Sequence, residues 1–189
     1  GWAGFLVAAR HPERVAAFVA LNIPPPWSGP EASLPLTVAN AWRAWYQVVL
    51  ASPVVGSRIV RRRAVLAQVL RADNVHEDAF SDEDVRLFAD ALAEPERARA
   101  SQQIYRSFLL RELPRLARNT YEPRPLTVPT LLLHGERDRV ITPDMVRASM
   151  RPGDRLEVEF VPDSGHWIAQ ERPDLVAERA LWWFREAHT

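Results

Sequence analysis

Two short polar loops hold the residues of this sequence that are best suited to acid–base chemistry. The first, His134 to Asp138 (HGERD), follows the apolar run TLLL, and the second, Asp163 to Trp167 (DSGHW), follows VEFV. Taken singly, Asp138 is typical of a helix cap and His166 of a hydrogen-bonded turn residue. In parallel sheets, however, functional groups gather at the carboxyl ends of strands, where a carboxylate can fix the tautomer of an imidazole. The two loops together therefore predict a catalytic acid–base pair of Asp138 and His166.

These loops must be positioned by strands that alternate with helices. Strands are predicted from short apolar runs over 15–22 (VAAFVALN), 128–135 (VPTLLLHG) and 156–162 (LEVEFVP). Helices are expected over 2–10, 144–150 and 173–187. Strands separated by helices predict an α/β fold with a parallel sheet.

The region from about Trp27 to Arg118 has a different pattern, in which apolar residues recur at spacings of three and four, as in RRRAVLAQVLR. This pattern predicts an all-helical block. One helix start is marked by Ser81, which precedes three acidic residues at the positive end of a helix dipole, and another lies near Glu94. An insertion of about 90 residues is too long for a plain crossover, so we expect a lid. The expected division is an α/β core over residues 1–24 and 125–189, and a helical lid over residues 25–124.

The composition argues against several classes of function. The 24 basic residues, all arginine, balance 24 acidic residues, so no net field draws the chain to nucleic acid or to an anionic membrane. The absence of cysteine excludes disulfides, thiol catalysis and zinc–thiolate sites. No apolar run reaches the length of a membrane span, so no membrane association and a cytoplasmic location are expected.

The remaining histidines give no sign of a metal site. His11, His76 and His188 have no partners at metal-ligand spacing, and His134, between a buried strand and a glycine, is expected to be structural. The sequence also has no glycine-rich phosphate loop. We therefore expect neither a metal nor a cofactor.

The two loops resemble the acid and base loops of the α/β-hydrolase fold, in which the chain order is nucleophile, acid, histidine. The opening GWAGFLVAARHPERVAAFVALN resembles the stretch that follows the nucleophile elbow of that fold. The resemblance implies that Gly1 is the last glycine of the elbow and that the nucleophile lies three residues earlier, outside this chain. The chain is then expected to be the C-terminal part of an α/β-hydrolase, comprising the end of the core sheet and the whole lid.

Two segments of the helical block resemble the cap segments of epoxide hydrolases, each of which supplies one tyrosine. AWRAWYQVVLASPVVG carries Tyr46, and QQIYRSFLLRELP carries Tyr105. Either tyrosine alone is typical of a half-buried packing residue. Two of only three tyrosines in such contexts favour a functional role, and Tyr121 is expected to be structural. A phenol can hydrogen-bond an epoxide oxygen and protonate it as the ring opens.

The resemblance implies a mechanism in two stages, with a small hydrophobic epoxide and water as substrates. The nucleophilic aspartate outside the chain attacks an epoxide carbon while Tyr46 and Tyr105 hold the oxygen, which gives a covalent ester. His166, oriented by Asp138, then activates water to release a diol. Trp167, directly after the histidine, is expected either to line the substrate pocket or to pack.

Other functions remain open at this stage. A haloalkane dehalogenase of the same fold would hold halide through tryptophan or asparagine donors, for which Trp42, Trp45 and Trp167 are candidates. A serine esterase would differ in the nucleophile. An inactive truncated product or a binding module is the alternative from another class. The 189 residues alone are expected to be inactive and poorly folded, because VAAFVALN and TLLLHG would expose apolar faces and a strand edge.

Overall fold

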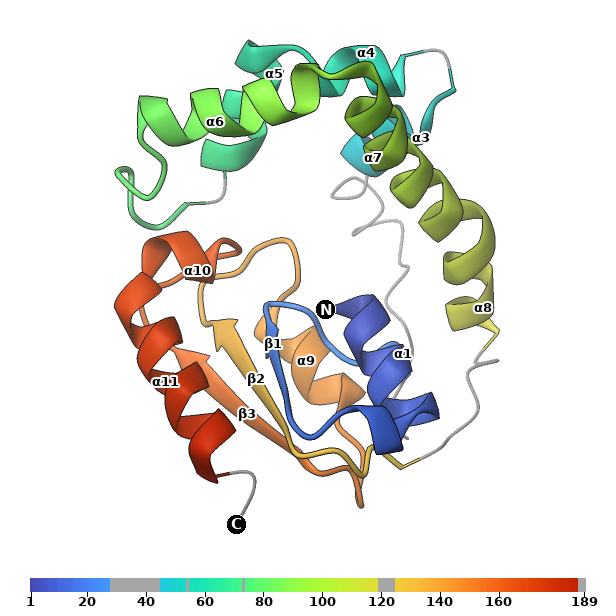
Figure 1. Ribbon diagram of the computed structural model, residues 1–189, viewed down its shortest axis with the longest axis vertical. Coiled ribbons are helices and arrows are strands. Elements are labelled where there is room, and N and C mark those ends of the chain that lie inside the picture. The colour runs from blue at the N-terminus through green and yellow to red at the C-terminus, as the bar shows by residue number, and fades with distance from the viewer. Residues whose placement is uncertain (28–44, 54, 73, 119–124, 187–189) are drawn as a thin grey trace. The chain divides into compact units, whose positions relative to one another are not determined.

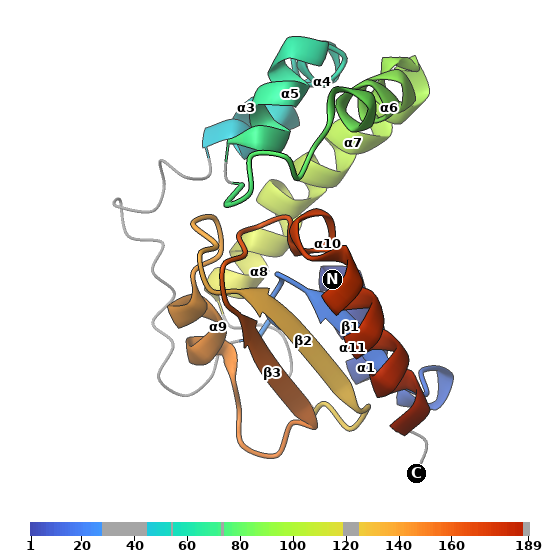
Figure 2. The same ribbon diagram turned by 90° about the vertical axis from the view of Figure 1, so that its left-hand side faces the viewer.

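The computed structural model describes residues 1–27, 45–53, 55–72, 74–118 and 125–186. They form two compact units. The first unit contains residues 1–27, 74–76 and 125–186, and the second contains residues 45–53, 55–72 and 77–118. Figures 1 and 2 show the first unit as a sheet with helices on both faces and the second as a group of helices.

The sheet of the first unit has three parallel strands in the order β1 (Phe18–Leu21), β2 (Thr130–Gly135) and β3 (Leu156–Val161). The predicted α/β fold with a parallel sheet is confirmed. Strand β1 is shorter than the predicted 15–22, because its ladder begins only where the Phe18 amide donates to the Pro129 carbonyl. At the other end of the sheet, Gly135 lies opposite Val161, so β2 and β3 end side by side.

Helices cover both faces of this sheet (Figure 2). The helical elements of the first unit are α1 (Trp2–Arg10), η1 (Pro12–Arg14), α9 (Pro143–Ser149), α10 (Ile168–Glu171) and α11 (Pro173–Glu186). Along β2, Leu132 packs in one buried cluster with Phe5 of α1, whereas Leu131 and Leu133 pack in another with Trp183 of α11. Successive strand side chains point to opposite faces, so both faces of β2 must be apolar. This explains the unbroken run TLLL.

The buried carboxylate of Asp154, in the loop between α9 and β3, binds residues that are distant from it in the sequence. Asp154 Oδ2 accepts from Trp27 Nε1 at 3.0 Å, and Oδ1 accepts from the Leu126 amide at 2.8 Å. The Arg151 guanidinium donates to both oxygens and also lies over the Trp27 ring. Trp27 and Leu126 flank the long middle stretch of the chain. One carboxylate therefore fixes the points where that stretch leaves and rejoins the first unit.

In the described residues of the second unit all regular secondary structure is helical. Its elements are α3 (Trp45–Ala51), α4 (Gly56–Val60), α5 (Arg63–Arg71), α6 (Asp82–Ala93), α7 (Pro95–Ser107), the π-helical turn η3 (Phe108–Glu112) and α8 (Leu113–Ala117). The predicted start at Ser81 is present as a capping box, in which Ser81 Oγ accepts from the Asp84 amide and the Asp84 carboxylate accepts from the Ser81 amide.

Helix α7 packs against α3 and α4 in this unit. Its buried Gln102 donates through Nε2 to the carbonyl oxygen of Ser52, just beyond the end of α3. At Gly56 a Cβ would overlap the carbonyl of Leu50, so glycine permits the close approach of α4 to α3. Among the helices that the structure describes, none combines the length and the apolar character needed to cross a membrane.

Candidate active site

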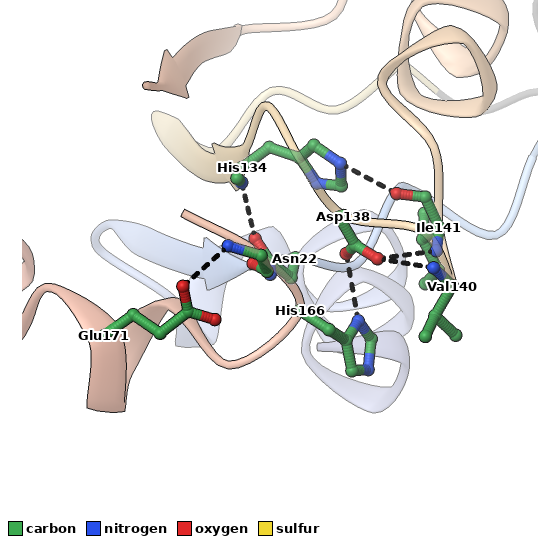
Figure 3. A network of polar contacts seen from close by, with 9 residues as sticks. Asn22, His134, Asp138, Val140, Ile141, His166 and Glu171 are labelled. Carbon is green, nitrogen blue, oxygen red and sulfur yellow. Dashed lines mark hydrogen bonds and ion pairs between the residues drawn. The ribbon is translucent and has the colours of Figure 1, made fainter. Parts of the chain in front are cut away.

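The predicted acid and base loops leave the sheet at adjacent places. The HGERD loop continues from β2 and the DSGHW loop from β3, and these two strands are hydrogen-bonded neighbours that run parallel. Their carboxyl ends therefore lie at one edge of the sheet, where open α/β folds bind ligands. Figure 3 shows the side chains that converge there.

Asp138 and His166 are in direct contact at this edge. Asp138 Oδ2 lies 2.9 Å from Nδ1 of His166, and the carboxylate is fully buried whereas the imidazole is 23% exposed. The second oxygen, Oδ1, accepts from the amides of Val140 at 2.8 Å and Ile141 at 2.9 Å (Figure 3). A carboxylate only accepts, so in the neutral imidazole Nδ1 is the nitrogen that carries the proton and Nε2 the one with the lone pair. This arrangement can support general-base chemistry at Nε2.

Main-chain contacts hold the two loops against each other. The amide of Arg137 donates to the Ser164 carbonyl at 2.9 Å, and the Glu136 amide donates to the Val161 carbonyl at 3.0 Å. At Gly135 a Cβ would overlap the carbonyl oxygens of Ser164 and Gly165, so a larger residue cannot be accommodated there without a shift of the backbone.

Arg137 and Asp163 also form an ion pair across the two loops, but both side chains are 61% exposed. Exposed pairs contribute about 0–1 kcal/mol. The buried backbone contacts are therefore the main link between the loops.

Trp167, directly after His166 in the sequence, packs edge-on against that histidine, with ring centroids 5.3 Å apart. The indole is half-buried. The indole therefore packs against His166, and a role in lining a substrate pocket stays a prediction.

The predicted tyrosines belong to the second unit. Tyr46 lies in α3 and Tyr105 in α7, and these two helices pack against each other. Tyr105 is half-buried. The side chains of Tyr46 and Trp45 lie outside the described residues, as do Trp42, Tyr121 and His188.

His134, the first residue of the acid loop, is completely buried. Its Nε2 lies 2.9 Å from the carbonyl oxygen of Ile141, and its ring packs edge-on against Phe160. Burial lowers the pKa of His134 below its usual range, although nearby Asp138 partly opposes the shift. The His134 imidazole is therefore held neutral beside Asp138. Among the residues that the structure describes, no three histidine or acidic side chains group closely enough to hold a metal ion.

The lowered pKa of His134 predicts a dependence of stability on pH. The folded state binds the His134 proton more weakly than the unfolded state, whose histidine titrates near about pH 6.5. The stability that neutral His134 provides is therefore complete above about pH 6.5 and is lost as the pH falls toward the lowered pKa. We expect the wild-type protein to lose stability in this range relative to His134→Gln, which keeps an amide donor but does not titrate.

The measurement is the free energy of urea unfolding of both proteins between about pH 5 and pH 8, where histidines titrate. The difference in unfolding free energy between the two proteins should be constant at the alkaline end of this range. As the pH falls, the wild-type protein should become less stable relative to the variant. A difference that does not change with pH would contradict a neutral buried imidazole.

Comparison with known proteins identifies the class. The sequence model of the alpha/beta hydrolase family matches residues 1–179, and the chain belongs to this family. Mouse (Mus musculus) epoxide hydrolase 3 is 49% identical over 55 residues, which is 28% of this chain and 15% of the mouse protein.

Solved structures show the same fold. Cfl2 from Burkholderia cenocepacia is 24% identical with a TM-score of 0.72, over 94% of this chain and 60% of its own. The epoxide hydrolase VrEH1 from Vigna radiata is 18% identical with a TM-score of 0.70, over 97% of this chain and 64% of its own. The chain thus spans less than two thirds of the length of these proteins.

Two polar residues at this edge were not among those predicted from the sequence. Asn22, one residue beyond β1, and Glu171, at the end of α10, both bind the backbone of Gly165 (Figure 3). A signal for Asn22 was present, because a polar residue directly after a buried strand also marks the other two loops. Glu171 lies in a short helix that carries no such signal.

Proposed function

We propose that the protein containing this chain is an epoxide hydrolase. The observation that carries the proposal is the 2.9 Å contact between the buried Asp138 carboxylate and Nδ1 of His166. This contact leaves Nε2 free to take a proton, as hydrolysis requires. The specificity for epoxides is supported by the two tyrosines on the packed helices α3 and α7 and by the 49% identity to mouse epoxide hydrolase 3 over 55 residues.

In the first proposed step, an aspartate carboxylate that precedes this chain attacks one epoxide carbon. The bond between that carbon and the ring oxygen breaks, and an ester bond forms. Tyr46 and Tyr105 hydrogen-bond the ring oxygen, and one phenol gives its proton to the developing alkoxide. In this proposal residues 25–124, which include the helical second unit, act as the lid that supplies both phenols.

In the second proposed step, Nε2 of His166 takes a proton from water, and the hydroxide attacks the ester carbonyl. The acyl–oxygen bond breaks, and the leaving alkoxide, which carries one oxygen from the aspartate, takes the proton of the imidazolium to complete the diol. Solvent oxygen stays in the aspartate, whose acid proton returns to the phenolate formed in the first step. Asp138 holds the imidazole in the required tautomer and stabilises the imidazolium that forms. The substrates are then a small hydrophobic epoxide and water.

A haloalkane dehalogenase is the second candidate, because Trp167 packs against His166 and its indole N–H is a donor suited to a halide. Both reactions pass through an ester of the nucleophilic aspartate and use the same base to hydrolyse it. They differ in the leaving group, which is a tethered oxygen in one and a free halide in the other.

Isotope labelling of a single turnover tests the proposed ester. Full-length protein in molar excess is mixed with styrene oxide or a chloroalkane in ¹⁸O-labelled water. The expected result is diol without label under these conditions, and labelled diol in a second experiment with excess substrate, in which the carboxylate has already exchanged its oxygen. Label in the first-turnover diol would contradict attack by a carboxylate, and release of chloride without diol formation would favour the dehalogenase.

A further inference from the structure

The residue before His166 has both of its main-chain polar groups bound by side chains. The Gly165 amide donates to Glu171 Oε2 at 3.0 Å, and its carbonyl oxygen accepts from Nδ2 of Asn22. Gly165 is itself buried. The backbone that carries His166 is therefore held by side chains from two different elements, one after β1 and one in α10.

Asn22 also binds the acid loop. Its side-chain Oδ1 accepts from the amide of Gly135 at 2.9 Å (Figure 3). Its main-chain N–H donates to the Leu133 carbonyl at 3.0 Å. The residue is 4% exposed, and its φ of 48° lies in the left-handed region, which asparagine tolerates better than most residues. One side-chain amide thus joins the ends of β1 and β2 to the loop that follows β3.

This bridge needs both functions of an amide. The Gly135 N–H requires an acceptor and the Gly165 carbonyl requires a donor, and a carboxylate of the same shape supplies only the acceptor. The hydrogen bond between Asp138 and His166 depends on how these two loops lie, because Gly135 and Gly165 lie three residues and one residue before them. The Asp138–His166 hydrogen bond is 2.9 Å long, and such bonds weaken beyond about 3.2 Å. A shift of a few tenths of an ångström in either loop is therefore enough to weaken it.

We propose that Asn22 is a positioning residue that keeps the acid and base loops in the alignment that the Asp138–His166 contact needs. Asn22 acts through the backbone of Gly135 and Gly165. The catalytic consequence rests on the proposed function, in which His166 is the base.

The test compares two variants of the full-length protein with a matched control. Asn22→Asp keeps the shape and removes the donor, and Asn22→Gly removes the side chain while accepting a positive φ. The control is Thr130→Val, since the buried Thr130 hydroxyl donates to the Val128 carbonyl at the opposite end of β2. Asn22→Asp and Thr130→Val each lose one buried polar contact and Asn22→Gly loses two, but only Asn22 touches the two loops.

Two measurements separate positioning from general destabilisation. For both Asn22 variants we expect kcat for epoxide to fall by about 10- to 100-fold with KM changed less than about twofold, because small misplacements of catalytic groups have effects of this size. The downfield proton resonance of the His166 Nδ1–H in the hydrogen bond to Asp138 should be lost or broadened. Thr130→Val should lower only the unfolding midpoint.

Wild-type kcat and an unchanged resonance in Asn22→Asp would overturn the proposal. An equal loss in all three variants would also overturn it, since the effect would then follow stability alone. The two proposals can also fail separately. If the wild-type protein leaves epoxides intact but the resonance is lost only in the Asn22 variants, the proposed function is contradicted and the role of Asn22 is still supported.

Discussion

In the His166→Gln variant of the full-length protein, epoxide is expected to be consumed once and retained as a covalent ester. Attack on the epoxide needs no base, whereas hydrolysis of the ester needs a group that takes a proton from water. Glutamine cannot take that proton, so release of diol should fall by about 10²- to 10⁴-fold. Intact-protein mass spectrometry should show a gain equal to the mass of the epoxide.

The matched control is His11→Gln, the same substitution at a histidine whose side chain is 58% exposed and whose contact is with Glu13. This variant should turn over at the wild-type rate and accumulate no ester. Steady wild-type turnover in His166→Gln would rule out His166 as the base, whatever the contact with Asp138. Loss of turnover without a mass gain would place the block before ester formation and would contradict the proposed order of steps.

The contact between Asp138 and His166 could be predicted because its signal is local. Asp138 and His166 each follow a short apolar strand at nearly the same distance, and parallel strands bring their carboxyl ends to one edge. The structure places the two side chains within hydrogen-bond distance. Prediction was possible here because strand alternation and loop position are properties of short stretches of sequence.

The support around that pair could not be predicted, because its contacts are long-range and reach backbone groups. Asn22 and Gly165 are 143 residues apart, and the sequence around neither residue indicates that the two are in contact. The short helix α10 was also missed. It is a single turn stabilised by tertiary contacts, with Ile168 almost fully buried, rather than by a helical pattern of its own.

The ends of helices and strands likewise divide into those that local sequence determines and those that depend on tertiary contacts. Helix α6 begins where Ser81 and Asp84 form a capping box, a signal contained in four residues. Strand β1 does not extend over Val15 to Ala17 despite their apolar character, since its ladder with β2 begins at Phe18. Local sequence thus determines a capped helix start, whereas the start of a strand is set by its neighbour.

The double variant Tyr46→Phe, Tyr105→Phe of the full-length protein is expected to abolish epoxide opening. Without a phenol the ring oxygen must leave as an unprotonated alkoxide, and the loss of such an acid costs about 10²- to 10⁴-fold in rate. The rate of ester formation in a single turnover is the quantity to measure. Each single variant should retain part of the rate, because the remaining phenol still hydrogen-bonds the oxygen.

Tyr121→Phe is the control, since Tyr121 is the one other tyrosine of the chain and has no proposed role. It should leave the rate of ester formation unchanged, and circular dichroism should show all variants folded. The comparison also separates the two candidate reactions. A halide leaves without a proton, so a dehalogenase would cleave a chloroalkane at the wild-type rate in the double variant. Wild-type epoxide opening in that variant would remove the epoxide hydrolase assignment, and the helices α3 and α7 would then carry these tyrosines for packing alone.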